Sequence, residues 1–84
     1  MESIRSLRYF ITVAEEESYT RAAKLLGVAQ PTLSKQLKEL ESEFGHALFA
    51  RPTRSVSLTP RGERLYERAK NIVALYDQAR RGAA

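Results

Sequence analysis

A glycine between two amphipathic segments constrains the fold more than any other feature of this sequence. Before Gly27, residues 19–26 carry Ala22, Ala23, Leu25 and Leu26 as an expected inner face, and Ser18 stands where a helix N-cap would be. After Gly27, apolar residues recur at spacings of four, three and four, at Leu33, Leu37, Leu40 and Phe44. This spacing is typical of one buried face of a helix. The sequence therefore predicts a helix, a tight turn and a second helix.

The spacing within this unit is that of a helix-turn-helix motif. Ala23 lies four residues before Gly27, and its small side chain would let the two helices cross closely. Gly27 suits the turn because a left-handed glycine ends a helix at little cost. Val28 and Leu33 supply apolar contacts that would hold the angle between the helices. Other alanine-rich helix pairs share this spacing, so the motif needs support from the rest of the chain.

Three further elements complete the predicted fold. A first helix is expected over residues 3–16, with a buried stripe of Ile4, Leu7, Phe10, Ile11 and Ala14. A β-hairpin is expected from residues 47–51 and 55–59. A last helix would begin with Thr59 as its N-cap and Pro60 at its first position. We expect a mainly α protein: a winged helix-turn-helix domain of three helices and a two-stranded β-wing (residues 1–59), then a long linker helix for dimerisation (residues 60–84).

The last helix carries an apolar pattern like that of a coiled coil. Its seam residues are Leu65, Ala69, Ile72, Tyr76 and Ala79, with Tyr66 and Val73 beside them. A helix of 20 residues spans about 30 Å, which is long for so small a core. We therefore expect part of this face to form a homodimer interface. Two alanines in the seam predict a modest interface.

The distribution of charge points to a polyanion as the partner. The net charge is +4, and the basic residues of 18–38 and 51–62 are accompanied by no acid. The sequence has no cysteine, one histidine (His46) and no glycine-rich phosphate loop, so we expect no metal, no cofactor and no enzymatic activity. No apolar run approaches the 18 residues of a membrane span, and the first residues lack a signal-peptide pattern. We expect a cytoplasmic protein.

The outward face of the helix after Gly27 changes character along its length. Pro31, Lys35 and Lys38 fall on the side opposite the apolar stripe, with Ser34 on the flank. The outward C-terminal half is expected to carry three acids, Glu39, Glu41 and Glu43. Because phosphates would repel those acids, the N-terminal turns should enter a major groove while the C-terminal end leaves it.

Each polar residue of the N-terminal half offers a specific contact to DNA. Gln30 can form paired hydrogen bonds with an adenine edge, and Pro31 offers an apolar surface to a thymine methyl group. Lys35 can reach a guanine edge or a phosphate, whereas Thr32 and Ser34 can contact bases or backbone. Any one of them could equally be an ordinary surface residue, but together they favour DNA contact. We expect Pro31 at the first helical position, with Gln30 outside the helix and its amide free to read a base.

Two other functions are compatible with parts of this sequence. A protein-interaction module could dimerise through the last helix and bind no nucleic acid. Binding to double-stranded RNA is disfavoured because the RNA major groove is too narrow for this helix. Arg51 could contact a phosphate or form an internal ion pair. Arg54, at the tip of the expected hairpin, is freer to reach a minor groove.

The stretches YTRAAKLLGVAQPTLSKQLKELE, LFAR and LTPRG occur together and in this order. They closely resemble the N-terminal DNA-binding region of LysR-type transcriptional regulators, and the resemblance covers nearly the whole chain. It implies a bacterial regulator that dimerises through the long helix and binds interrupted inverted repeats of double-stranded DNA as a dimer or tetramer. It also implies a ligand-sensing effector domain, so we expect this chain, which stops at Ala84, to be a fragment of a full-length regulator.

The resemblance implies a role for individual residues. Positions in the major groove would be Gln30, Pro31, Ser34 and Lys35, to which we add Thr32. Residues at phosphates would be Ser18, Thr20 and Arg21, to which we add Lys38 and Arg51. Arg54 would enter the minor groove. The chain departs from the family pattern at Thr32, where proline or another small residue is often found, and at Lys35, where arginine is common; lysine lacks arginine's bidentate fork.

Overall fold

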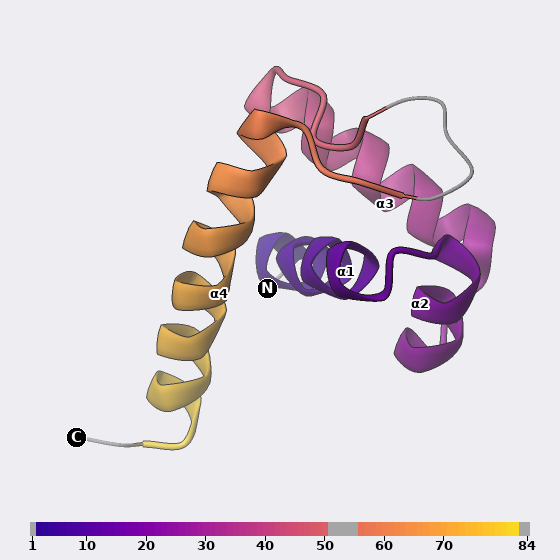
Figure 1. Ribbon diagram of the computed structural model, residues 1–84. Coiled ribbons are helices and arrows are strands. Elements are labelled where there is room, and N and C mark those ends of the chain that lie inside the picture. The colour runs from indigo at the N-terminus through magenta and orange to yellow at the C-terminus, as the bar shows by residue number, and fades with distance from the viewer. Residues whose placement is uncertain (1, 51–55, 83–84) are drawn as a thin grey trace.

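The computed structural model describes residues 2–50 and 56–82. In these residues the chain forms four helices, α1 (Glu2–Glu16), α2 (Tyr19–Leu26), α3 (Gln30–Phe44) and α4 (Pro60–Arg80). Helix α1 lies at the centre, with α2 and α3 on one side and α4 on the other (Figure 1). The mainly α fold with a long final helix agrees with the fold expected from the sequence. No helix in the described part of the chain is long and apolar enough to cross a membrane.

The core is built around α1, which is packed on two sides. Phe10 and Val13 are fully buried, and the rings of Phe10 and Phe49 meet in an edge-to-face arrangement with centroids 5.4 Å apart. The sequence stripe identified Phe10 but missed Val13, whereas Ile11 and Ala14 are only half-buried. The reason is that α2 and α3 contact one side of α1 and α4 contacts another, so the buried sector is wider than a single stripe.

Helix α2 begins and ends as the sequence predicted. The Ser18 side chain accepts a hydrogen bond from the Arg21 amide, and Gly27 adopts a left-handed conformation with φ of 70°. Nothing lies within 4 Å of the position of a Gly27 Cβ, so the backbone conformation, and not crowding, requires glycine. The expected inner face is wrong at Leu25, which is 67% exposed, whereas Ala22 and Ala23 are buried and Leu26 packs against the core.

Helix α3 starts one residue earlier than expected. The amide of Leu33 donates to the carbonyl of Ala29 over 3.1 Å, which makes Ala29 the N-cap. Gln30 is therefore the first helical residue and Pro31 the second. The prediction that Gln30 lies outside the helix is wrong, because the preference of a residue before proline for extended backbone is outweighed by the first helical hydrogen bond.

The apolar stripe of α3 is buried only over its first three positions. Leu33, Leu37 and Leu40 are almost completely buried, but Phe44 is 46% exposed. Phe44 is the last residue of α3, and the chain reverses directly after it at Gly45, which has φ of 75°. The prediction that Phe44 belongs to the buried face is therefore wrong.

The segment between α3 and α4 folds back on itself as a short antiparallel pair. Phe49 and Leu58 form an isolated antiparallel bridge, and the amide of Ala50 donates to the carbonyl of Ser57 over 2.8 Å. The sequence predicted this pairing, but the described residues form a single bridge in place of two strands of five residues each. The tip of the expected hairpin, residues 51–55, lies outside the described residues.

The start of α4 is fixed to the base of this wing. Thr59 is the N-cap and Pro60 the first helical residue, as predicted. The Thr59 hydroxyl accepts from the amide of Gly62 over 3.0 Å and donates to the carbonyl of Ala47 over 2.7 Å. One side chain therefore both caps α4 and holds the helix against the chain that precedes the wing.

The inner face of α4 packs on its own domain. Ala69 is fully buried and Val73 nearly so, both in the cluster that contains Phe10. The expectation that Ala69 and Val73 lie in a dimer interface is corrected, because α1 already covers them. The apolar side chains that α4 leaves exposed include Ile72 at 43% and Leu75 at 64%. The seam pattern missed Leu75.

Candidate nucleic-acid interface

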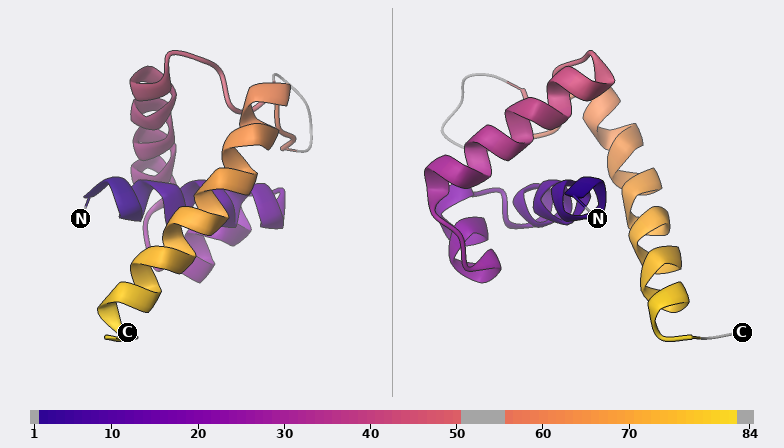
Figure 2. Two further views of the ribbon diagram at one scale, coloured as in Figure 1. Left: turned by 90° about the vertical axis from the view of Figure 1, so that its left-hand side faces the viewer. Right: turned by 180° about the vertical axis from the view of Figure 1, so that it is seen from behind.

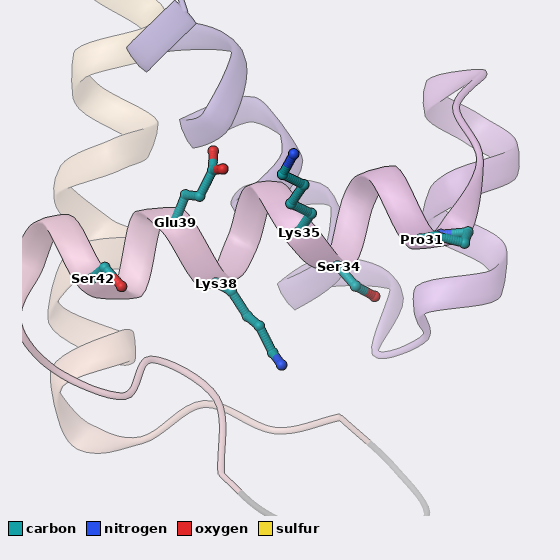
Figure 3. Close-up of a pocket in the computed structure, with 6 residues that line it drawn as sticks. All are labelled: Pro31, Ser34, Lys35, Lys38, Glu39 and Ser42. Atoms are coloured by element: carbon teal, nitrogen blue, oxygen red, sulfur yellow. The ribbon is translucent and has the colours of Figure 1, made fainter.

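The exposed surface of α3 brings together most of the residues expected to read DNA bases. A shallow depression on this surface is lined by Pro31, Ser34, Lys35, Lys38, Glu39 and Ser42. Figure 3 shows Lys35 and Glu39 pointing to one side of α3 and Lys38 to the other. The structure thus forms a continuous strip that is basic over its first turns and acquires an acid at Glu39.

The N-terminus of α3 is suited to bind an anion. Ala29 supplies no side-chain hydrogen bond to the first turn, so the amide groups there face outward without a cap. Gln30, Pro31 and Thr32 are all exposed at this end. Free amide groups and the positive end of the helix dipole favour a phosphate.

Gln30 is linked to α2 by a side-chain hydrogen bond. The Thr20 hydroxyl donates to the Gln30 Oε1 atom over 3.3 Å. The expectation that the Gln30 amide is unengaged is therefore corrected. Its NH₂ group keeps both donors, and Oε1 keeps a second lone pair, so paired hydrogen bonds to a base edge remain possible.

Three of the residues expected at phosphates, Ser18, Thr20 and Arg21, lie at the start of α2. The Ser18 oxygen accepts from the Arg21 amide over 3.0 Å, which leaves the hydroxyl proton available to donate. The Arg21 guanidinium donates to the Glu16 carbonyl over 2.6 Å and lies 3.6 Å from its carboxylate. Because arginine has five N–H donors, this contact leaves others for a phosphate. The Arg21 side chain is 64% exposed.

The positive charge of α3 is not neutralised within the described part of the chain. Lys35 and Lys38 are exposed, and neither belongs to any of the ion pairs found among residues 2–50 and 56–82. Glu39 and Glu43 are also exposed, as expected for acids that lie toward the C-terminal end of α3. The basic half and the acidic half of the helix are therefore presented as the sequence predicted, except at Glu41.

Glu41 turns inward and holds the wing against α3. Its Oε2 atom accepts hydrogen bonds from the amides of Leu48 over 2.7 Å and Phe49 over 3.3 Å. The prediction that Glu41 is an outward acid is wrong, because its carboxylate accepts from two amides at the base of the wing. Sequence reasoning missed this role, since nothing distinguishes Glu41 from its neighbours Glu39 and Glu43 in the pattern.

Three basic or titratable residues remain from the sequence predictions. Arg51 and Arg54 lie outside the described residues. His46 is exposed, and its Nε2 atom contacts the guanidinium of Arg61, which links the turn after α3 to the first turn of α4. No group of three His, Cys, Asp or Glu side chains suited to a metal ion occurs among the described residues.

Comparison with known proteins identifies the same motif. Residues 4–63 match the family described as bacterial regulatory helix-turn-helix protein, lysR family. The HTH-type transcriptional regulator BudR of Klebsiella aerogenes is 57% identical over 76 residues, which cover 90% of this chain and 53% of BudR. CysL of Bacillus subtilis is 46% identical over 74 residues, which cover 88% of this chain and 25% of CysL. The chain thus spans about half the length of the first relative and a quarter of the second.

Solved structures of related proteins share the fold. A crystal structure of the BenM DNA-binding domain with benA site 1 DNA has a TM-score of 0.88 and 45% identity, covering 90% of this chain and 85% of that one. Full-length OxyR C199D from Pseudomonas aeruginosa has a TM-score of 0.91 and 39% identity, and the match covers 95% of this chain and 27% of the OxyR chain. Family match, identity and fold agree on a regulatory and not an enzymatic protein. The chain belongs to the LysR family of bacterial helix-turn-helix regulators.

Proposed function

We propose that this chain is the DNA-binding domain of a LysR-type transcriptional regulator and recognises a promoter site in double-stranded DNA. Helix α3 enters the major groove by its N-terminal turns. The observation that carries this function is the exposed, acid-free strip from Gln30 to Lys38 at an uncapped helix N-terminus. The likeness to the BenM DNA-binding domain, which was solved with benA and catB site 1 DNA, supports it.

The proposed contacts divide into three groups. Bases in the major groove are contacted by Gln30, Pro31, Thr32, Ser34 and Lys35. Phosphates are contacted by Ser18, Thr20, Arg21, Lys38 and Arg51. Arg54 enters the adjacent minor groove. This division follows the general rule that backbone contacts position a protein and base contacts specify the sequence. Such a function places the protein in the bacterial cytoplasm, where promoter DNA lies.

A selection from a random duplex pool, followed by titration at two salt concentrations, tests this function. The chain should enrich one short motif and bind it much more tightly than a shuffled duplex, with both affinities falling as salt rises. A module that only dimerises through α4 would enrich nothing and show no salt-sensitive binding. That second result would reject the proposed function in favour of the interaction module.

We further propose that the chain forms a homodimer through the outer face of α4. The apolar side chains that α4 leaves exposed include Ile72, Leu75 and Ala79, and the neighbouring Leu65 and Tyr76 are half-buried. Two copies related by a two-fold axis would place two α3 helices on an interrupted inverted repeat. In the full-length protein such dimers would assemble further into tetramers.

Replacing Ile72 with aspartate should weaken the dimer by about tenfold or more, because a charge would be buried at the centre of the apolar face. Sedimentation velocity over a concentration series measures the change. Leu25→Asp is the matched control, since Leu25 is also exposed but lies on α2. If Ile72→Asp and Leu25→Asp leave the same monomer–dimer equilibrium, the outer face of α4 is not the interface.

A further inference from the structure

Two polar contacts fasten α4 to α1 at separate points along the long helix. The guanidinium of Arg8 donates to both carboxylate oxygens of Asp77, with Nη2 to Oδ1 at 2.5 Å and Nη1 to Oδ2 at 3.3 Å. The hydroxyl of Tyr66 donates to Oε2 of Glu15 over 2.7 Å. Neither contact touches the helix-turn-helix surface, and the DNA-binding function uses none of these four residues.

The two contacts restrain the direction of α4. Tyr66 and Asp77 are eleven residues apart, or about 16 Å along a helix. Between them Ala69 and Val73 are buried against the core. An apolar contact alone lets a helix rock or slide, whereas a bidentate arginine–carboxylate pair is specific in geometry. With one contact on each side of the buried residues, both rocking and sliding of α4 on α1 are opposed.

The two contacts shift the pKa values of Asp77 and Tyr66. The hydrogen bond from Arg8 lowers the pKa of Asp77 below its usual value, which favours the ionised carboxylate that accepts the two N–H groups. The hydrogen bond to Glu15 raises the pKa of Tyr66, which keeps the phenol protonated as a donor. Both shifts favour the forms of Asp77 and Tyr66 that make these contacts.

Helix α1 transmits this restraint to the recognition helix. Ser6 of α1 donates to Gln36 of α3 over 3.1 Å, and Phe10 and Leu33 belong to the same buried cluster. The direction of α4 is thus linked to that of α3 through α1, and Figure 2 shows α4 crossing α1 while α3 packs on a different side of it. If two copies pair through α4, that direction decides how far apart and at what angle the two α3 helices lie.

We infer that the Arg8–Asp77 and Glu15–Tyr66 contacts determine which half-site spacing the dimer accepts. This inference rests on the proposed function and makes the four side chains positioning residues for specificity. One additional base pair moves a half-site by about 3.4 Å and turns it by about 35°. A dimer whose α4 helices are held rigidly cannot bind the altered spacing well, whereas a dimer with less restrained α4 helices can adjust to it. The Arg8 and Asp77 side chains are 39% and 34% exposed, so their loss should cost the fold little.

The test uses duplexes that carry two copies of the selected half-site, with the separation changed by one base pair at a time, and a duplex with a single half-site. The variants are Asp77→Asn and Tyr66→Phe, each of which removes one contact with little change of shape. Glu63→Gln is the matched control, because Glu63 is an exposed carboxylate in the first turn of α4 that enters no ion pair in the described ranges. Circular dichroism checks that each variant is folded.

Both variants should reduce the preference for the best spacing over its neighbours by about fivefold, as expected from one lost pair of this kind. Glu63→Gln should keep the full preference, and all proteins should bind the single half-site equally. Arg8→Asp should behave like Asp77→Asn, and combining Arg8→Asp with Asp77→Arg should restore part of the preference. A purely structural role would change the stability of the fold and would leave the spacing preference as it is in wild type.

Two results would overturn the inference without touching the proposed function. One is an unchanged spacing preference in Asp77→Asn and Tyr66→Phe; the other is a wild-type protein that accepts all spacings equally. In either case, tight binding to the single half-site would show that DNA recognition stands. A wild-type protein that binds the selected site no more tightly than a shuffled duplex would instead reject the proposed function, and the inference with it.

Discussion

Leu33→Ala should lower the free energy of unfolding by about 3–5 kcal/mol, which is the loss typical of a fully buried leucine. Leu33 is 0% exposed and lies in the cluster where α1, α2 and α3 meet. A domain of this length has only about 4–13 kcal/mol of stability. Much of the population could therefore unfold at 37 °C, and DNA binding would fall with it.

Urea denaturation followed by circular dichroism measures this loss. Leu25→Ala is the control, because it removes the same atoms from a side chain that is 67% exposed in the neighbouring helix. Its effect should stay within about 0.5 kcal/mol, as for other surface substitutions. Equal losses in the two variants would contradict the assignment of Leu33 to the core and of Leu25 to the surface.

Gly62→Ala should destabilise the protein by about 3 kcal/mol, at the upper end of the usual cost of overpacking. A Cβ atom at Gly62 would overlap the carbonyl oxygen of Leu48 and would lie 3.1 Å from the Leu58 side chain. The oxygen belongs to the backbone at the base of the wing, so it cannot rotate away. The first turn of α4 would have to move off the wing.

The matched comparison is Gly27→Ala, which tests a different reason for glycine. Gly27 has φ of 70°, but no atom lies within 4 Å of the place that an alanine methyl group would take, so only the cost of the left-handed backbone applies. That cost is about 1–2 kcal/mol. Thermal unfolding should rank Gly62→Ala as the more damaging change. A smaller effect at Gly62 than at Gly27 would contradict the close approach of α4 to Leu48.

Features set by neighbouring residues were predictable from the sequence. Ser18 and Thr59 cap helices, and Gly27 closes the turn, because each effect needs only a few adjacent residues. The helix-turn-helix and the basic half of α3 followed from spacing and charge. The start of α3 was misplaced by one residue because a proline after Gln30 gave a stronger local signal than the alanine that caps the helix.

Features set by distant packing were not predictable in this way. An apolar heptad does not reveal which helix covers it, so Ala69 and Val73 were assigned to a partner although α1 covers them. Glu41 looks like its acidic neighbours until the fold brings the amide of Leu48 to its carboxylate. The bond from Thr20 to Gln30 depends in the same way on how α2 and α3 cross.

Base reading by the first turn of α3 is the centre of the proposed mechanism, and Gln30→Ala tests it most directly. Affinities of wild type and variant for the selected site and for a shuffled duplex should be measured at one salt concentration. Gln78→Ala, which removes an exposed glutamine from α4, is the control. Gln30→Ala should lose about 1–3 kcal/mol of binding free energy on the selected site and almost none on shuffled DNA. Gln78→Ala should bind both duplexes as tightly as wild type. Equal losses of Gln30→Ala on both duplexes would contradict base reading by Gln30.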